Sequence, residues 1–151
     1  MFEKAVAMNP KAQLTMGNLA DAYRWSGQKQ QAAATYDKAI ALAYKDLAVN
    51  PRDASTMGSL ALYYGKKGDV QRGLSFIRRA RSIDATDVYL VYSEALLDCL
   101  DGRKLDALTT LRQALQQGYP VQEAQNDPEL KDIQSMLEFA SLVKEFSGKQ
   151  K

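Results

Sequence analysis

Residues 16–28 read MGNLADAYRWSGQ, and a similar pattern returns twice further along the chain. Residues 57–69 read MGSLALYYGKKGD, and residues 91–103 read VYSEALLDCLDGR. Each copy starts with a large apolar residue, has an alanine four positions later and reaches a glycine eleven positions after its start. The second and third glycines are 34 residues apart, whereas the first and second are 41 apart. A recurring period of this length indicates a repeat protein.

Each glycine separates two segments with helical periodicity, so each copy predicts a pair of helices. Small residues at Ala20, Ala61 and Ala95 allow two helices to approach to about 8–10 Å. Glycine directly after the first helix suits a left-handed C′ position. One pair cannot bury its apolar face alone, so neighbouring pairs must stack. The predicted fold class is therefore all-α.

These positions resemble the tetratricopeptide repeat (TPR) family. The first copy matches that family's pattern at Met16, Leu19, Ala20, Tyr23, Gly27, Ala32, Tyr36 and Ala39. The second copy matches at Met57, Leu60, Ala61, Tyr64, Gly68, Ile77 and Ala80. The third, weaker copy matches at Val91, Ala95, Gly102, Ala107, Leu111 and Ala114. Residues before the first copy, Phe2, Ala5 and Pro10, match the tail end of an earlier unit. The resemblance covers residues 1–119 and implies a right-handed α-α superhelix, a TPR solenoid of about three repeats.

The resemblance, together with the residue pattern after position 119, predicts the domain boundaries. The TPR domain would cover residues 1–147, with a half-repeat at 1–10, repeats at 12–51, 53–85 and 86–119, a capping helix at 127–147 and a polar tail at 148–151. The first repeat carries seven extra residues, which equal about two helical turns and barely change the phase of the helix face. Residues 29–49 are therefore predicted to form one long helix.

The C-terminal part follows a different pattern. Residues 121–127 are expected to form a loop or short turn. Asp127, Pro128 and Glu129 then give a capping side chain, a first-turn proline and an early acid, which together indicate a helix start. A helical apolar stripe continues the helix to about residue 147, and we expect it to cover the open end of the stack. Its members are Ile133, Met136, Leu137, Ala140, Leu142, Val143 and Phe146.

This ending resembles the C-terminal end of TPR segments attached to bacterial serine/threonine kinases and nucleotide cyclases. The matching residues are Ala114, Leu115, Gly118, Tyr119, Asp127, Pro128, Glu129, Leu130 and Phe139. None of the catalytic residues of those enzymes can be placed in this chain.

The composition argues against catalysis by the chain itself. It has no histidine and one cysteine, Cys99, so the commonest general base, the usual zinc sites and a Cys–His pair are missing. No glycine-rich phosphate loop occurs. We therefore expect a protein that is not an enzyme and that has no cofactor and no metal site.

Charge and hydropathy restrict the partners. The net charge is +2 with acids and bases interleaved, so nucleic acid is not an expected partner. No apolar run approaches the roughly 18 residues of a membrane span, so no direct membrane insertion is expected. We expect a cytoplasmic location, or a periplasmic one if the chain belongs to a larger membrane protein. The apolar face of Phe2, Ala5 and Val6 lacks a partner helix, which predicts either missing upstream sequence or self-association through this end.

In the TPR family the first helices line a concave groove that binds extended peptides or helices. The resemblance places the groove lining and its neighbours at Leu14, Asp21, Arg24, Trp25, Leu62, Lys66, Tyr89, Tyr92 and Leu96. Family members that bind acidic chaperone tails carry a Lys and Asn clamp, but Gly17, Asp21, Gly58 and Leu62 occupy those positions here. Chaperone-tail binding is therefore not expected.

The resulting functional hypothesis is a protein-protein interaction scaffold, in which the groove binds a peptide or helix of another protein. It would be a regulatory or recruiting segment of a larger bacterial protein. The alternative is a structural spacer or dimerisation element without a free peptide ligand.

Two charge clusters leave alternatives open. Glu94 and Asp98 are four residues apart on one predicted helix face, which fits a site for a cation or basic peptide, a face turned to solvent, or pairing with nearby arginines. The predicted second helix of the second copy carries several arginines, which could bind phosphate or form a solvated outer face. These residues are Arg72, Arg78, Arg79 and Arg81.

Overall fold

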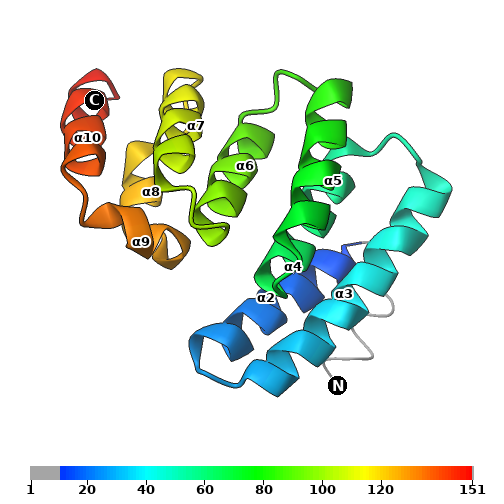
Figure 1. Cartoon of the computed structure of the whole chain (residues 1–151). Coiled ribbons are helices and arrows are strands. Elements are labelled where there is room, and N and C mark those ends of the chain that lie inside the picture. Colours follow the sequence, from blue (N-terminus) through cyan, green and yellow to red (C-terminus); the bar gives the residue numbers. More distant parts are fainter. Residues whose placement is uncertain (1–10, 151) are drawn as a thin grey trace.

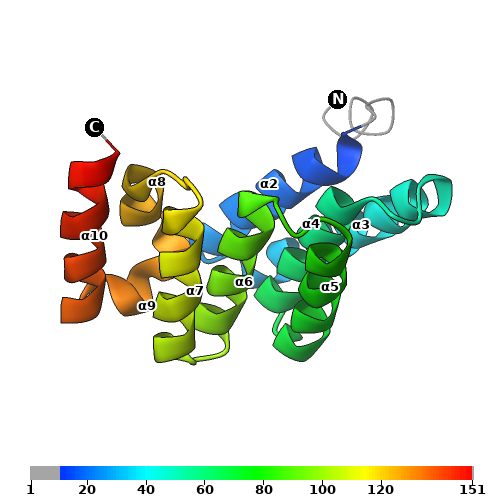
Figure 2. The ribbon, with the colours of Figure 1, turned by 90° about the horizontal axis from the view of Figure 1, so that it is seen from above.

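Helices pack in consecutive pairs along the chain in the computed structural model, which describes residues 11–150 (Figure 1). The architecture is all-α, and no strand occurs within that range. The paired helices are α2 (Ala12–Trp25) with α3 (Lys29–Val49), α4 (Ala54–Lys66) with α5 (Val70–Ile83), and α6 (Val88–Leu100) with α7 (Lys104–Gln116). Figure 2 shows these pairs followed by the C-terminal helices in one row. The expected half-repeat at residues 1–10, and the self-association expected through it, lie outside the described residues.

The turns inside the pairs share one hydrogen-bonded form. Gly27, Gly68 and Gly102 have φ values of 81°, 105° and 76°, which places each in the left-handed region expected at C′. After Gly27, the N–H of Gln28 donates to the carbonyl of Tyr23 at 2.9 Å, and the Gly27 N–H donates to Arg24 at 3.2 Å. The same two bonds follow α4 and α6, so all three first helices end in a Schellman motif.

Small residues hold the helices of each pair together, as the sequence predicts. Ala20, Ala61 and Ala95 are fully buried, and so are their counterparts Ala39, Ala80 and Ala114 on the second helices. At Gly73 of α5, an added Cβ would lie 2.6 Å from the carbonyl oxygen of Ala61. The α4–α5 approach therefore leaves no room for a side chain at this position.

The expected long helix is confirmed, because α3 is continuous from Lys29 to Val49. In its last turns Ala43 is buried and Leu47 packs against two core clusters, whereas Val49 is exposed. Tyr44 makes an edge contact with Phe76 of α5, with ring centroids 6.3 Å apart. One side of the extension therefore packs on the neighbouring pair through Tyr44 and Leu47, and its tip is exposed.

The C-terminal part differs from the expectation of a loop followed by one helix. The structure has α8 (Val121–Asn126), the 3-10 turn η1 (Pro128–Leu130), α9 (Lys131–Gln134) and α10 (Leu137–Lys149). Met136 has φ −80° and ψ 145°, an extended conformation that separates α9 from α10. This break lets Leu130 and Ile133 pack on one axis and Phe139, Leu142 and Phe146 on another, all in one core cluster. A helical stripe in sequence does not show such a change of axis.

The expected polar tail, residues 148–151, is helical in its first residues and hydrogen-bonded to the protein at Gln150. α10 continues to Lys149, and the side chain of Gln150 accepts from the backbone N–H of Val121 at 2.7 Å and donates to the carbonyl of Tyr119 at 2.8 Å. Gln150 thus joins the end of α10 to the start of α8.

Candidate functional site

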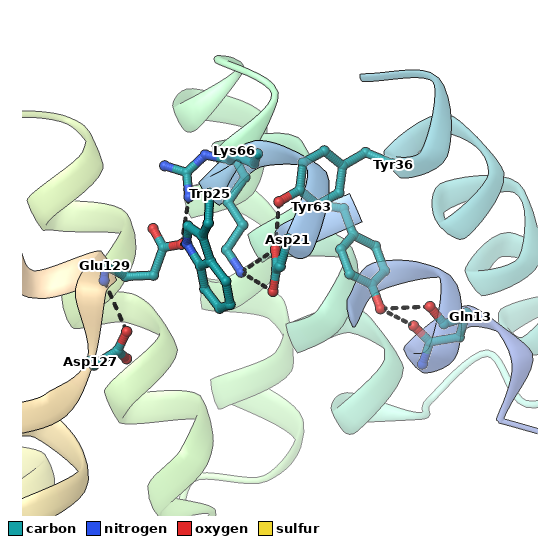
Figure 3. A network of polar contacts seen from close by, with 9 residues as sticks. Gln13, Asp21, Trp25, Tyr36, Tyr63, Lys66, Asp127 and Glu129 are labelled. Carbon is teal, nitrogen blue, oxygen red and sulfur yellow. Dashed lines mark hydrogen bonds and ion pairs between the residues drawn. The ribbon is translucent and has the colours of Figure 1, made fainter. Parts of the chain in front are cut away.

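A row of polar contacts runs along α2 and reaches the C-terminal turn η1 (Figure 3). At its centre, Asp21 accepts a hydrogen bond from the hydroxyl of Tyr36 on α3. Both Asp21 carboxylate oxygens lie 3.0 Å from Nζ of Lys66 on α4, whose side chain is buried. Charged hydrogen bonds in such surroundings are strong, and removing one partner is costly. Asp21 therefore ties α2 to both α3 and α4.

The N-terminal end of the row is neutral and buried. The Tyr63 hydroxyl of α4 donates toward the carbonyl and side-chain oxygens of Gln13, at 3.0 and 2.5 Å. An added Cβ at Gly17 would lie 2.5 Å from the Tyr63 ring, so the glycine makes room for that ring. Burial raises the pKa of Tyr63, and burial with the Asp21 hydrogen bond raises that of Tyr36, so both hydroxyls stay protonated donors at neutral pH.

The C-terminal end of the row joins segments that are far apart in sequence. Glu129 of η1 accepts from Nη1 of Arg24 at 2.5 Å and from the indole Nε1 of Trp25 at 3.0 Å. The Glu129 side chain is only 5% exposed, although it is charged. These contacts connect the last turn of α2 to a segment 104 residues later in the chain.

The turn that carries Glu129 is fixed from its other side. Asp127 accepts from the Glu129 backbone N–H at 2.9 Å and from the Tyr92 hydroxyl of α6 at 2.6 Å. The Tyr92 ring stacks on Tyr119, with centroids 3.8 Å apart and 9° between the planes. Burial and the Asp127 hydrogen bond raise the pKa of Tyr92, so its hydroxyl remains a donor. η1 is therefore anchored on α6 independently of α2.

A cleft of about 720 Å³ lies between the end of α2, the end of α6 and the η1–α9 segment. A smaller cavity of about 290 Å³ lies on the α3–α4 side and shares Arg24 with the first. The larger cleft is lined by Arg24, Trp25, Cys99, Leu100, Pro128, Glu129, Lys131 and Asp132. Arg24 thus separates two hollow regions of one surface.

The structure brings together four of the predicted groove residues and separates the others. Asp21, Arg24, Trp25 and Lys66 belong to the polar row. Leu14 and Trp25 are exposed, at 42% and 56%.

The remaining predicted residues belong to the second and third pairs. Leu62 packs against the core. Tyr89 is 63% exposed and makes an edge contact with Tyr119. Tyr92 and Leu96 are each only 5% exposed, so the prediction that they line an open groove needs correction. The C-terminal segment packs over this part of α6, and a partner has no access to their side chains.

Sequence reasoning missed Asp127 and Glu129 as members of this site. In the sequence, both residues indicate a helix start and belong to the stretch that resembles the end of TPR segments, and Asp127 does cap η1. Their long-range contacts with Tyr92 and Arg24 depend on how η1 folds back over α6. No short-range pattern in the sequence carries that information.

The charge cluster on α6 is paired internally. Arg81 of α5 contacts Glu94, and Arg103 lies 2.6 Å from Asp98. Burial raises the pKa of Asp98, while the Thr110 hydroxyl and the Arg103 charge oppose that rise. Of the open alternatives, pairing with nearby arginines is the one that the structure shows.

The arginines of α5 also contact neighbouring side chains. The Arg72 guanidinium lies 5.0 Å from the Tyr64 ring centroid, and that of Arg79 lies 5.9 Å from the Phe76 centroid. These are cation–π distances. Such contacts fit an outer face on which charged groups cover aromatic rings.

Comparison of the chain with protein-family models and with curated proteins gives no match. Among residues 11–150, no helix combines the length and apolar character needed to cross a membrane.

Proposed function

We propose that this chain is a TPR-type solenoid whose α2 face binds a segment of another protein. Three features support the TPR assignment. The three pairs end their first helices in the same Schellman motif, place alanine at equivalent buried positions and follow one another in phase. The resemblance in sequence rests on these same positions.

One observation carries the functional proposal: an exposed tryptophan borders a large cleft. Trp25 is 56% exposed at the edge of the cleft of about 720 Å³. Leu14 and Asp21 lie on the same face of α2, because spacings of seven and four residues return to one side of a helix. Aromatic residues beside a hollow are frequent binding hot spots. A peptide or helix lying along α2 would meet Leu14 at one end and Trp25 at the other.

The resemblance of the C-terminal part to TPR segments of bacterial kinases and cyclases supports a regulatory or recruiting role within a larger protein. The alternative is a structural spacer or dimerisation element. The contact of Glu129 with Arg24 and Trp25 favours that alternative, because it fills part of the surface with the chain's own residues.

A peptide-display selection on the immobilised chain tests the proposal. We expect short peptides to be enriched, and Trp25→Ala to weaken their binding by roughly tenfold or more, as for a hot-spot aromatic residue. Leu105→Ala is the matched control, since Leu105 is an exposed apolar residue on α7 away from the cleft lining. Absence of any enriched peptide would support the spacer instead, and equal binding by the Trp25→Ala and Leu105→Ala chains would contradict the role of the α2 face. Thermal unfolding of each variant checks that the fold is retained.

A further inference from the structure

The contact between Glu129 and the end of α2 has the features of a built carboxylate site. A guanidinium and an indole N–H converge on one carboxylate oxygen, at 2.5 and 3.0 Å. The Glu129 side chain is 5% exposed, so these donors act in a partly desolvated place where charged hydrogen bonds are strong. Trp25 supplies both a donor and an exposed ring. Such an arrangement can recognise a carboxylate that lies next to an apolar group.

Glu129 can leave this site without unfolding its own turn. Asp127 holds η1 through its bond with Tyr92. The Gln134 side chain donates to the carbonyls of Ala124, at 3.2 Å, and of Asp127, at 2.7 Å. None of these bonds involves α2. Release of Glu129 therefore requires the loss of the Arg24 and Trp25 contacts and the rotation of one side chain.

The surroundings favour an incoming acid over a base. The smaller cavity next to Arg24 is lined by Lys29, Lys66 and Lys67. Lys66 is paired with Asp21 and Lys67 with Asp37, so the pairs are close to neutral. Arg24 and Lys29 add positive charge beyond these pairs. An acidic side chain that replaced Glu129 would keep Arg24 neutralised, whereas a basic one would leave two cations together.

We propose that Arg24 and Trp25 form a carboxylate-binding site that Glu129 occupies within the chain and that an acidic side chain of the partner peptide occupies on binding. This inference rests on the proposed function, since it names the chemistry of the partner at the same surface. Glu129 is then an internal competitor. The apparent dissociation constant for a partner equals the intrinsic constant divided by the fraction of chains in which Glu129 has left the site.

The probe is a synthetic peptide with the sequence of residues 125–134, QNDPELKDIQ, labelled at its N-terminus, and a second peptide with its glutamate replaced by glutamine. Binding is measured by fluorescence anisotropy to the wild-type chain, to Glu129→Gln and to Glu138→Gln. Glu138 is an exposed acid on α10 and serves as the matched control. Because Trp25 is the only tryptophan, its indole N–H resonance reports the same site directly.

We expect Glu129→Gln to bind the glutamate peptide roughly tenfold more tightly than the wild-type chain, because one charged acceptor no longer competes. Glu138→Gln should bind the glutamate peptide as the wild type does. The glutamine peptide should show little of the increase in affinity that the glutamate peptide shows on Glu129→Gln. Equal affinity of the wild type and Glu129→Gln for the glutamate peptide, or equal binding of the two peptides to Glu129→Gln, would overturn the proposal.

Two further arms keep the result decisive. If Glu129→Gln does not fold, Arg24→Gln is used with Glu129 intact, and it should bind the two peptides with equal affinity. A Glu preference that persists in Arg24→Gln would overturn the proposal. Display selection is repeated on wild type and Glu129→Gln: enriched peptides without acids, unaffected by Glu129→Gln, would overturn the carboxylate site but leave the scaffold proposal standing. No enrichment on either chain would overturn both.

Discussion

The first and third helix pairs use the same repeat position in opposite ways. Gly17 of α2 and Tyr92 of α6 are equivalent, since each follows the first large apolar residue of its copy. Gly17 leaves space that the Tyr63 ring of the next pair fills. Tyr92 instead projects toward the C-terminal segment, stacks on Tyr119 and bonds to Asp127. A repeat position therefore fixes the face on which a residue lies, whereas the segment that follows decides whether the face stays open.

The largest effect on the free energy of unfolding is expected at Tyr92. Tyr92→Ala removes a buried ring, its stacking on Tyr119 and its hydrogen bond to Asp127. It should lower the free energy of unfolding by about 3–5 kcal/mol. Tyr89→Ala, at an exposed position on the same helix, should cost under about 1 kcal/mol. Urea unfolding of both variants measures the difference. Equal losses would show that Tyr92 is not covered by the C-terminal segment.

A smaller effect is expected at the equivalent Gly17. The Cβ in Gly17→Ala would lie 2.5 Å from the Tyr63 ring, and the bonds of Tyr63 to Gln13 oppose a shift of that ring. We expect a net loss of about 1–2 kcal/mol, since overpacking outweighs the better helix propensity of alanine.

Gly148→Ala is the control for that prediction. Gly148 lies in α10 and has nothing within 4 Å of an added Cβ. Alanine there should stabilise the protein by up to about 1 kcal/mol through helix propensity alone. Thermal unfolding of the two variants should therefore move in opposite directions. A stabilising Gly17→Ala would contradict the close packing of α2 on Tyr63.

The smallest effect on stability is expected at Cys99, which is equivalent to Arg24 in the repeat. Cys99 is buried and lines the cleft. Burial raises the pKa of its thiol to about 11. At pH 8 the folded chain should therefore react with a disulfide reagent far more slowly than the chain in urea, because little thiolate forms. The rate should rise steeply between pH 9 and 11.

The same shift affects stability. Because the folded-state pKa is raised, the native state keeps a proton that the unfolded state releases, and stability falls as the pH rises from about 9 to 11. Cys99→Ala should lose less stability across this pH range. Fast labelling at pH 8 in the folded state would show that the third pair is more open than the structure describes.

Local patterns in the sequence predicted much of the fold. The glycines after the first helices specify turns within a few residues of themselves, the alanines specify close contacts with the adjacent helix, and the seven extra residues keep the phase of α3. The C-terminal part was not predicted as well. The break at Met136 follows from packing of Leu130 and Phe139 on different axes, which the apolar stripe does not encode.

The candidate site shows the same division. The positions of Arg24 and Trp25 on an exposed end of α2 follow from their place in the repeat. The burial of Tyr92 and Leu96 does not, because it depends on Tyr119 and the segment after it. The role of Glu129 depends on a contact across 104 residues, which one sequence cannot specify.

The most direct test of the central claim, that the α2 face of the first pair binds a segment of another protein, is a titration followed at one resonance. ¹⁵N-labelled chain is titrated with the peptide most enriched in display selection while the indole N–H signal of Trp25 is recorded. We predict a saturable shift of that signal. The dissociation constant fitted to the shift should equal the one measured by anisotropy of the labelled peptide. Binding with an unchanged Trp25 signal would place the partner elsewhere and contradict the account.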